Sequence, residues 1–505
     1  MEEIQSRASA LDANLPPSVM VCMKKFLEWK YWKYVVAFLV AVIFLMLINQ
    51  SLDNDSWFVL AEGKYLVENG IHYTDVLTMH EGLNIVVQNY GFAAVFYLIY
   101  SAFGAPGLYV TMLFLNLIIC VLIYKICMLI SKRNVNLSLA IMLATDLLLA
   151  LGFVVTRAQM VSYVTFLSLI YVLELYVKTG RWKYLWWFPV ISLVEINFHA
   201  SYWWLLFLVW FVYVIDAIKK PKLHLQGYRC KPLLLMGIVS LLMGLVNPYG
   251  IKMITYVFTS YGAPEITSMV IEMHPFDLRD IFNVTLYMML TVVSFLYIFG
   301  DKKKIRVRYI LMFLGFLGLG LNAVKGMSQF VLVMFFPLAL MYRDIKVEKI
   351  IDAKIGRNAL TFWSGVVVLS LFVTLCVLVI PDIKNGPSDT VMQAVDAIEL
   401  DSNGNKDIKV YVGYNNGGYV EFRGYKAYID PRAEVFLDKN NGKENILKEW
   451  EEFCDAGIRV EDFLEKYDFD YLILEEWCEK ELYRDGSDGY ELIYEENGVK
   501  VLRKA

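Results

Sequence analysis

Two aspartates separated by one residue, Asp53 and Asp55, directly follow the first apolar stretch of the chain. Two carboxylates at this spacing could share a metal ion. Alternatively, one could act as a general base whose pKa is raised by its neighbour and by partial burial. A helical pattern of apolar residues follows and ends at Gly70, so Asp55 or Ser56 could simply cap that helix. The acidic pair alone leaves these alternatives open.

Further polar and ionisable residues gather in the links that follow every odd-numbered apolar run. Arg157 and Glu195 lie close to the ends of such runs, where a charged group must find water or a partner. A carrier more often places charges midway through its helices, so this distribution favours chemistry at one membrane face over transport. The polar residues in these links include Asp75, Arg157, Gln159, Asn197, His199, Glu272, His274 and Lys325.

The elements that position these residues are expected to be membrane-spanning helices. Of the 505 residues, 58% are hydrophobic, whereas soluble domains are nearer 45–50% apolar. The apolar residues fall in runs of about 16–22, a length that crosses a bilayer. The sequence predicts an all-α membrane bundle of about eleven transmembrane helices, at 34–50, 107–130, 136–154, 160–177, 184–197, 201–218, 232–247, 283–300, 308–323, 328–342 and 360–380.

Lysine and arginine are concentrated in every second link, at 132–133, 178–183, 219–231, 302–308 and 343–357. Because cytoplasmic links are enriched in these residues, the alternation predicts the orientation of the chain. Residues 1–33 are expected in the cytoplasm, 34–380 in the cell membrane as a multi-pass domain, and 381–505 outside it. No small-residue cleavage site follows the first run, so it is expected to be retained.

One shorter apolar run, 90–103, would break this alternation if it crossed the membrane. It is followed by Gly104-Ala105-Pro106-Gly107, which is typical of a break between helices. We therefore expect an interfacial or re-entrant helix within an outer loop at 51–106.

Residues 381–505 are expected to form a small extracytoplasmic α/β domain. Asp430 and Arg432 could be a pair that fixes a strand end, or could recognise a sugar or acceptor near the membrane. Cys454 and Cys478 could pair outside the cell, and no cysteine spacing indicates a zinc site. Strand-like runs lie at 409–413, 419–422, 426–429, 471–474, 492–494 and 499–502, and helical patterns at 388–399, 443–455 and 459–466.

The order of motifs along nearly the whole chain resembles the GT-C superfamily of polyprenyl-phosphate-sugar-dependent membrane glycosyltransferases, and more closely a bacterial branch with a C-terminal extracytoplasmic α/β domain. The chain departs from that branch at Glu195-Ile196 and at Val87-Gln88-Asn89-Tyr90, where Trp and a His-Glu-Trp-like run are usual. The matching residues are Asp53, Asp55, Trp57, Gly63, Gly70, Asp75, the segment 89–104, Arg157-Ala158-Gln159, Asn197-Phe198-His199, Asn247-Pro248-Tyr249-Gly250, Asn416-Gly417-Gly418-Tyr419-Val420 and Ile429-Asp430-Pro431-Arg432-Ala433.

The resemblance implies inverting transfer of a sugar to a cell-envelope glycan, lipid or protein, with membrane lipids as surroundings and no nucleic acid as partner. Asp55 is the first candidate for the base and Asp53 the second. Some GT-C enzymes need a divalent cation and others do not, so Mg²⁺ or Mn²⁺ on Asp53 and Asp55 stays open. The implied donor-phosphate ligands are Arg157, His199 and Lys325, and the implied substrate or acceptor residues are Asp75, Gln159, Asn197, Glu272, His274, Asp430 and Arg432.

Two other classes of function remain as alternatives. The chain could be a lipid or sugar transporter, or a polymer-handling membrane protein, without transferase chemistry. It could also be an outer-face sensor or an assembly scaffold that uses the C-terminal domain.

Overall fold

The computed structural model describes residues 32–45, 52–150, 152–218, 228–260, 263–275, 293–294, 297, 300–301, 305–344, 389–455, 457–476, 479–485 and 488–505. The predicted span at 360–380, nearly all of the one at 283–300, and Cys478 lie outside these residues.

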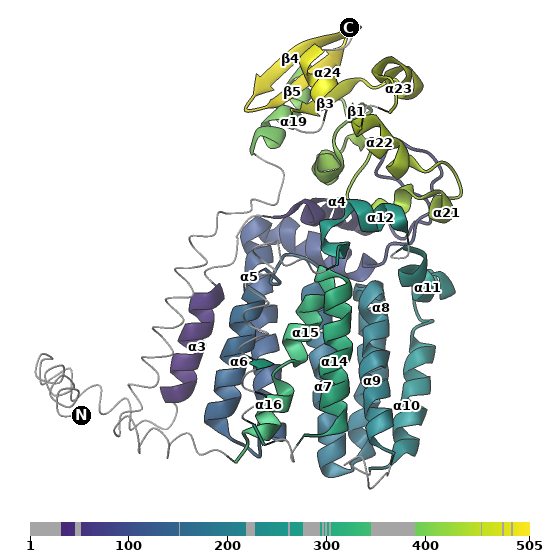
Figure 1. Ribbon diagram of the computed structural model, residues 1–505. Coiled ribbons are helices and arrows are strands. Elements are labelled where there is room, and N and C mark those ends of the chain that lie inside the picture. Colours follow the sequence, from purple (N-terminus) through teal and green to yellow (C-terminus); the bar gives the residue numbers. More distant parts are fainter. Residues whose placement is uncertain are drawn as a thin grey trace, which may run out of the picture.

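Apolar helices run side by side in a bundle beneath a smaller unit that contains a sheet (Figure 1). Within the described residues, three helical stretches are long and apolar enough to cross a membrane: Tyr90–Ile130, Gln159–Thr179 and Val324–Met341. The bundle consists of α3 (Trp32–Leu45), α5 (Tyr90–Ile130), α6 (Val135–Ala150), α7 (Gln159–Thr179), α8 (Trp187–Phe198), α9 (Trp203–Asp216), α10 (Cys230–Met243), α14 (Val307–Asn322), α15 (Met327–Val333) and α16 (Phe336–Met341).

An ion-pair network joins three bundle helices at the end away from the sheet. Arg308 on α14 lies 2.9 Å from Glu174 on α7 and 2.9 Å from Asp216 on α9. The sequence places Arg308 in a basic link, but its side chain is buried between these helices. Its charge is neutralised by carboxylates near the ends of α7 and α9. The apolar pattern of each run could not reveal this pairing between helices.

The first loop forms helix α4 (Asn54–Asn69), which ends at Gly70 with φ of 89°, as predicted. The prediction that Asp55 or Ser56 caps this helix is wrong. Asp53 is the cap, because its Oδ1 accepts a hydrogen bond from the backbone N–H of Ser56 at 2.9 Å. Asp55 therefore lies in the first helical turn, where it is not needed as a cap.

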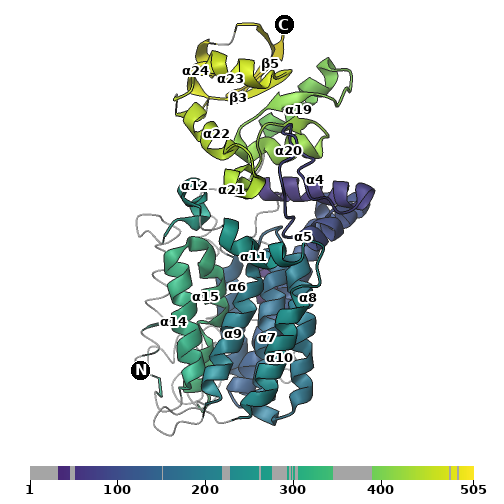
Figure 2. The ribbon, with the colours of Figure 1, turned by 90° about the vertical axis from the view of Figure 1, so that its right-hand side faces the viewer.

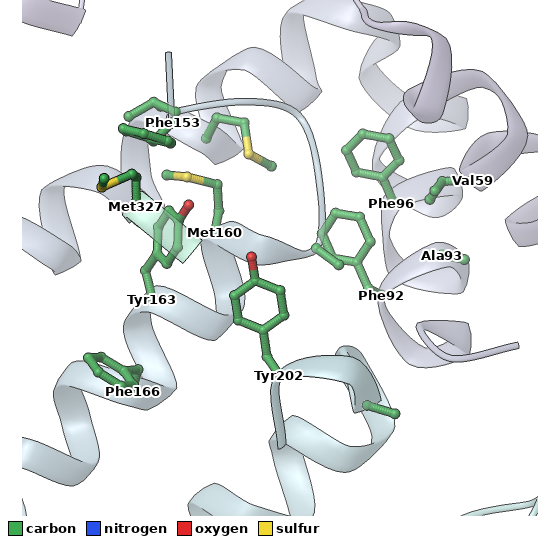
Figure 3. Packing of buried hydrophobic residues seen from close by; sticks show 14 of the residues in the cluster. Val59, Phe92, Ala93, Phe96, Phe153, Met160, Tyr163, Phe166, Tyr202 and Met327 are labelled. Carbon is green, nitrogen blue, oxygen red and sulfur yellow. The ribbon is translucent and has the colours of Figure 1, made fainter. Parts of the chain in front are cut away.

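Helix α5 breaks at Gly104, which has φ of 64°, so the predicted interruption is confirmed. The segment before Gly104 lies beside α4 at the sheet end of the bundle (Figures 1 and 2). A Cβ on Gly63 of α4 would lie only 2.1 Å from the carbonyl oxygen of Ala93, so the two backbones touch. On the same segment of α5, the rings of Phe92 and Phe96 stack with centroids 4.9 Å apart (Figure 3).

The C-terminal unit contains a five-stranded sheet in the order β2-β1-β3-β5-β4. Strands β2, β1 and β3 are parallel, and β5 and β4 are antiparallel additions. The elements are α19 (Asp389–Asp401), β1 (Lys409–Tyr411), α20 (Gly417–Phe422), β2 (Lys426–Ala427), α21 (Asp438–Asn441), α22 (Ile446–Cys454), α23 (Val460–Tyr467), β3 (Tyr471–Glu475), α24 (Lys480–Asp485), β4 (Tyr490–Glu496) and β5 (Val499–Lys504).

The prediction of a strand at 419–422 is wrong, because these residues form helix α20. Gly417 and Gly418 bring the start of α20 against two other backbones. A Cβ on Gly417 would lie 1.8 Å from the oxygen of Ile429, and one on Gly418 would lie 2.6 Å from the nitrogen of Phe58. This tertiary packing overrides the β propensity of Tyr419 and Val420.

The sheet unit docks on α4 and on the loop that follows it. The Trp57 ring meets the Tyr419 ring edge-on with centroids 4.9 Å apart. Thr78 bridges Ala427 of β2 in a parallel sense, and the N–H of Met79 donates to the Ala427 oxygen at 2.9 Å. The first loop thus adds to one edge of the sheet, and α4 is held between the sheet unit and the bundle (Figure 2).

Replacing Gly418 with alanine should destabilise this junction. The new methyl group would meet the Phe58 backbone at 2.6 Å, and such overpacking costs about 1–3 kcal/mol. Gly315→Ala is the matched control, because a Cβ there would meet nothing within 4 Å. Thermal unfolding of the purified proteins in detergent measures the difference. Equal melting temperatures for the two variants would contradict the close approach of α20 to α4.

Candidate active site

Arg157, which precedes α7, is the centre of a cluster of ionised side chains. Its Nε lies 2.5 Å from Asp53 Oδ2, and its Nη1 lies 3.0 Å from Asp55 Oδ2 and 2.8 Å from Glu272 Oε1. Asp53 and Asp55 come from the start of α4, and Glu272 comes from the short turn η4 (Ile271–Met273). The structure therefore brings together four residues that the sequence placed in three separate outer links; we call them the Arg157 cluster.

The two aspartates of this cluster have different surroundings. Asp53 uses Oδ1 to accept from the Ser56 N–H at 2.9 Å and from the Ser56 hydroxyl at 2.5 Å, while Arg157 holds its Oδ2. The Ser56 hydroxyl also contacts Thr156 Oγ1 at 2.6 Å. The side chain of Asp55 is mostly buried but 33% exposed, so it is partly desolvated and still within reach of a bound molecule. Asp55 is thus the better placed of the two for proton transfer.

The electrostatics of the cluster raise the pKa of Asp55 to about 6. Burial is the largest cause, Arg157 opposes it, and the negative charges of Asp53 and Glu272 raise the pKa further. Arg157 and Lys325 outweigh burial at Glu272 and lower its pKa. At neutral pH Asp55 is therefore ionised, yet it takes up a proton more readily than an ordinary aspartate.

Lys325 lies beside the cluster on the short turn η6 (Val324–Gly326). The N–H of Val324 donates to the His274 oxygen at 3.1 Å, which fixes η6 against the turn that carries Glu272. The Lys325 charge acts on both Asp55 and Glu272. A second cation thus acts on the same carboxylates as Arg157, and His274 supports its position through the backbone.

His199 lies in the same region but in an apolar setting. Its Nδ1 is 2.8 Å from the Ser162 hydroxyl, and its ring stacks on Tyr202 with centroids 4.4 Å apart. Burial, and secondly the charge of Lys325, lower the pKa of His199 to about 3. The ring is therefore neutral at physiological pH, so it can offer an N–H donor to a phosphate but no positive charge.

Two other candidates from the sequence make contacts that shape the backbone. Asn197 donates to the carbonyl oxygens of Leu193 at 2.7 Å and Val246 at 3.0 Å, and it accepts from the Tyr90 hydroxyl. Gln159 donates to the Phe153 oxygen at 3.4 Å. Both residues tie together segments around the Arg157 cluster.

A second cluster of charges, which we call the Arg432 cluster, joins the sheet unit to the first loop. Arg432 lies 2.5 Å from Asp430, 2.9 Å from Asp75, 3.2 Å from Glu62 and 3.7 Å from Glu421. The side chain of Arg432 is only 5% exposed. Asp430 and Arg432 are thus buried at the junction, and Asp75 belongs to the same group.

This second cluster holds more negative than positive charge. Burial would raise the pKa of Asp75, but Arg432 and two hydrogen bonds from Thr78 outweigh it and lower that pKa. Burial and the charge of Asp430 raise the pKa of Glu421 well above its usual range. The sequence did not indicate the roles of Glu62 and Glu421. Glu62 follows Asp55 by seven residues, two turns along the same helix face, which is the signal that could have found it.

The carboxylates of the Arg157 cluster do not form a metal site as they stand. Arg157 occupies the facing oxygens of Asp53 and Asp55, and the other oxygen of Asp53 caps α4. Among the residues that the structure describes, no group of three His, Cys, Asp or Glu side chains is placed to hold a metal ion.

No protein-family model and no curated protein sequence matches this chain. In structure, the chain is similar to the Archaeoglobus fulgidus oligosaccharyltransferase, solved as a complex with Zn and sulfate. The TM-score is 0.52 with 9% sequence identity, over 93% of this chain and 73% of the other. The likeness concerns the fold. The apolar helices are those of a membrane protein, and their arrangement is similar to the fold of this oligosaccharyltransferase.

Replacing Arg432 with methionine should destabilise the chain by about 3–5 kcal/mol, because buried carboxylates would lose the arginine that pairs with them. Arg423→Met is the control. Arg423 pairs with Asp396 and Glu399, whose side chains are 59% and 39% exposed, so its loss should cost less than about 1 kcal/mol. Chemical or thermal unfolding in detergent gives both values. Similar costs for the two variants would show that the Arg432 cluster does not hold the junction.

Proposed function

We propose that this chain is a membrane glycosyltransferase that moves a sugar from a polyprenyl-phosphate donor to a cell-envelope acceptor at the outer face of the membrane. The observation that carries the proposal is the placement of Asp55, partly exposed and with a raised pKa, beside the cations Arg157 and Lys325. A base next to cations is what transfer from a lipid phosphate requires. The GT-C-type fold supports the same reaction class.

The proposed reaction inverts the anomeric carbon by direct displacement. Asp55 takes the proton of the acceptor hydroxyl, and the acceptor oxygen forms a bond to the anomeric carbon. The bond from that carbon to the phosphate oxygen breaks on the opposite side, and polyprenyl phosphate leaves with the electron pair. Arg157 and Lys325 stabilise the negative charge that develops on this phosphate. No other proton donor is needed, because the leaving phosphate is a stable anion at neutral pH.

The remaining candidates take indirect places in this mechanism. Asp53 orients Arg157 and caps the helix that carries the base. Glu272 contacts the same Nη1 of the guanidinium as Asp55 does, and with His274 it would close over the bound acceptor. His199 can donate a neutral N–H to the donor phosphate. Asp75, Gln159, Asn197, Asp430 and Arg432 position the segments around the site through the contacts described above.

The proposed orientation follows from the links between helices. The basic links at 132–133 and 178–183 follow α5 and α7, at the end of the bundle away from α4 (Figure 1). Basic links favour the cytoplasm, so the Arg157 cluster and the sheet unit would face outward. We propose a multi-pass chain of about eleven spans with residues 1–33 inside, the membrane domain at 34–380, and the domain at 381–505 outside.

The donor and acceptor can be sought directly. The purified chain would be incubated with a panel of polyprenyl-phosphate sugars and with envelope glycans, lipids or peptides, and loss of each donor would be followed. Transfer of one sugar would establish the reaction. Flux of a lipid or sugar across vesicles without any new glycosidic bond would instead favour the transporter alternative.

Asp55→Asn should lower the rate of transfer by about 10²–10⁴-fold, which is the usual contribution of a general base. Asp53→Asn should lower it less, because Asp53 acts through Arg157 and the helix cap. Glu68→Gln, at an exposed position of the same helix, should leave the rate unchanged. Initial rates with the donor found above measure the effects. Full activity of both aspartate variants would rule out the assignment of the base.

The pH dependence should report the raised pKa of Asp55. A base must be deprotonated to act, so kcat/KM should rise about tenfold per pH unit below about pH 6 and level off above it. Glu272→Gln removes a negative charge that raises this pKa, so the acidic limb should move to lower pH. Rates across pH 4.5–8 at constant ionic strength test this. If the acidic limb of the pH profile does not move in Glu272→Gln, that limb does not report the titration of Asp55.

A further inference from the structure

The guanidinium of Arg157 lies where an ion bridging the Oδ2 atoms of Asp53 and Asp55 would bind. Its Nε and Nη1 are 2.5 Å and 3.0 Å from the Oδ2 atoms of the two aspartates. A divalent cation binds carboxylate oxygens at about 2.0–2.6 Å. An ion that bridged these two Oδ2 atoms would have to approach the oxygens that the guanidinium contacts, so the ion and the guanidinium cannot occupy the position together.

The cluster has no easy way to rearrange around an ion. The second oxygen of Asp53 accepts two hydrogen bonds from Ser56, at 2.9 Å and 2.5 Å, and turning it would remove the cap of α4. Glu272, the third carboxylate of the cluster, also faces Arg157, at 2.8 Å. All three acids are thus directed at one guanidinium. Arg157, and not a bound ion, supplies the positive charge that these three carboxylates face.

An arginine can also perform the tasks that an ion would have in this reaction. It neutralises the carboxylates beside the base, and its N–H groups form charge-assisted hydrogen bonds with phosphate oxygens. The described contacts with the carboxylates use Nε and Nη1, so Nη2 is the nitrogen left to donate to a phosphate oxygen. Lys325, which acts on Asp55 and Glu272, adds a second positive charge beside it. Three carboxylates and two cations leave a net charge of −1.

We propose that Arg157 replaces the divalent cation at this site, so that the Asp53–Asp55 pair binds no metal ion and the transfer proceeds without one. The statement about the reaction rests on the proposed function, whereas the statement about metal binding does not. Arg157 holds the acidic pair in place and receives the phosphate of the donor.

Metal binding is tested by titrating the purified full-length chain with Mn²⁺ after dialysis against EDTA, with free Mn²⁺ followed by electron paramagnetic resonance. We expect no stoichiometric binding to the wild type up to about 1 mM Mn²⁺, which is the weak end of the range for protein sites of hard divalent cations. Arg157→Met should bind one Mn²⁺ at least about tenfold more tightly than the wild type, because three carboxylates would then face one another. Adding Asp55→Asn to that variant should remove the binding.

Either of two results would overturn the proposal. One is tight binding of a single Mn²⁺ by the wild type that Asp55→Asn abolishes. The other is the same lack of binding in a folded Arg157→Met chain as in the wild type, because the guanidinium would then not be what excludes the ion. Arg157→Lys serves if the methionine variant does not fold, since lysine keeps the charge but cannot bridge both aspartates. It should bind Mn²⁺ more tightly than the wild type does.

Activity gives an independent measurement. If a donor is found, transfer by the wild type should be the same with 5 mM EDTA (about the usual excess over trace metal) as with added Mg²⁺ or Mn²⁺. Loss of transfer in EDTA that Mn²⁺ restores would contradict the proposal. If no donor is ever consumed, the proposed function fails, and the Mn²⁺ titration still decides whether Arg157 excludes the ion.

Discussion

Two arginines from distant parts of the chain hold helix α4 in place. Arg157, which precedes α7, pairs with the acidic residues at its beginning, and Arg432, from the C-terminal unit, pairs with Glu62 farther along it. Each arginine is largely buried among carboxylates, so neither side can leave without exposing an unpaired charge to a poorly hydrated interior. The position of the candidate base on α4 therefore depends on both the bundle and the sheet unit.

The chemistry of the site follows from a balance between burial and charge. Removing water from Asp55 favours its neutral form, while Arg157 favours its ionised form. The nearby acids Asp53 and Glu272 add to the effect of burial, so the pKa of Asp55 is raised. A small movement of α4 would change the burial of Asp55 and its distances to these charges together. Backbone contacts leave little room for such a movement, because Gly63 touches α5 on one side and Gly418 touches α4 from the other. Tight packing thus sets the acidity of the base.

Sequence patterns predicted what depends on local structure. The end of α4 at Gly70 and the break at Gly104 follow from glycine conformation, and the alternation of basic links placed Asp55, Arg157 and Lys325 at one end of the bundle. Contacts between segments that are distant in the sequence could not be predicted from these patterns. The capping role of Asp53, the helix at Gly417–Phe422, the pairing of Arg432 with Glu62 and the burial of Arg308 all depend on neighbours far away in the sequence.

The attachment of the first loop to the edge of the sheet has a consequence for biosynthesis. The contacts of Arg432 with Glu62 and of Tyr428 with His80 join residues 370 and 348 positions apart. At a synthesis rate of about 5–20 residues per second, the first loop waits roughly 20–70 seconds for its partner. During that time Glu62 and Asp75 are without the arginine that neutralises them. The first loop therefore cannot complete the Arg432 cluster until a segment made 370 residues after Glu62 has joined it.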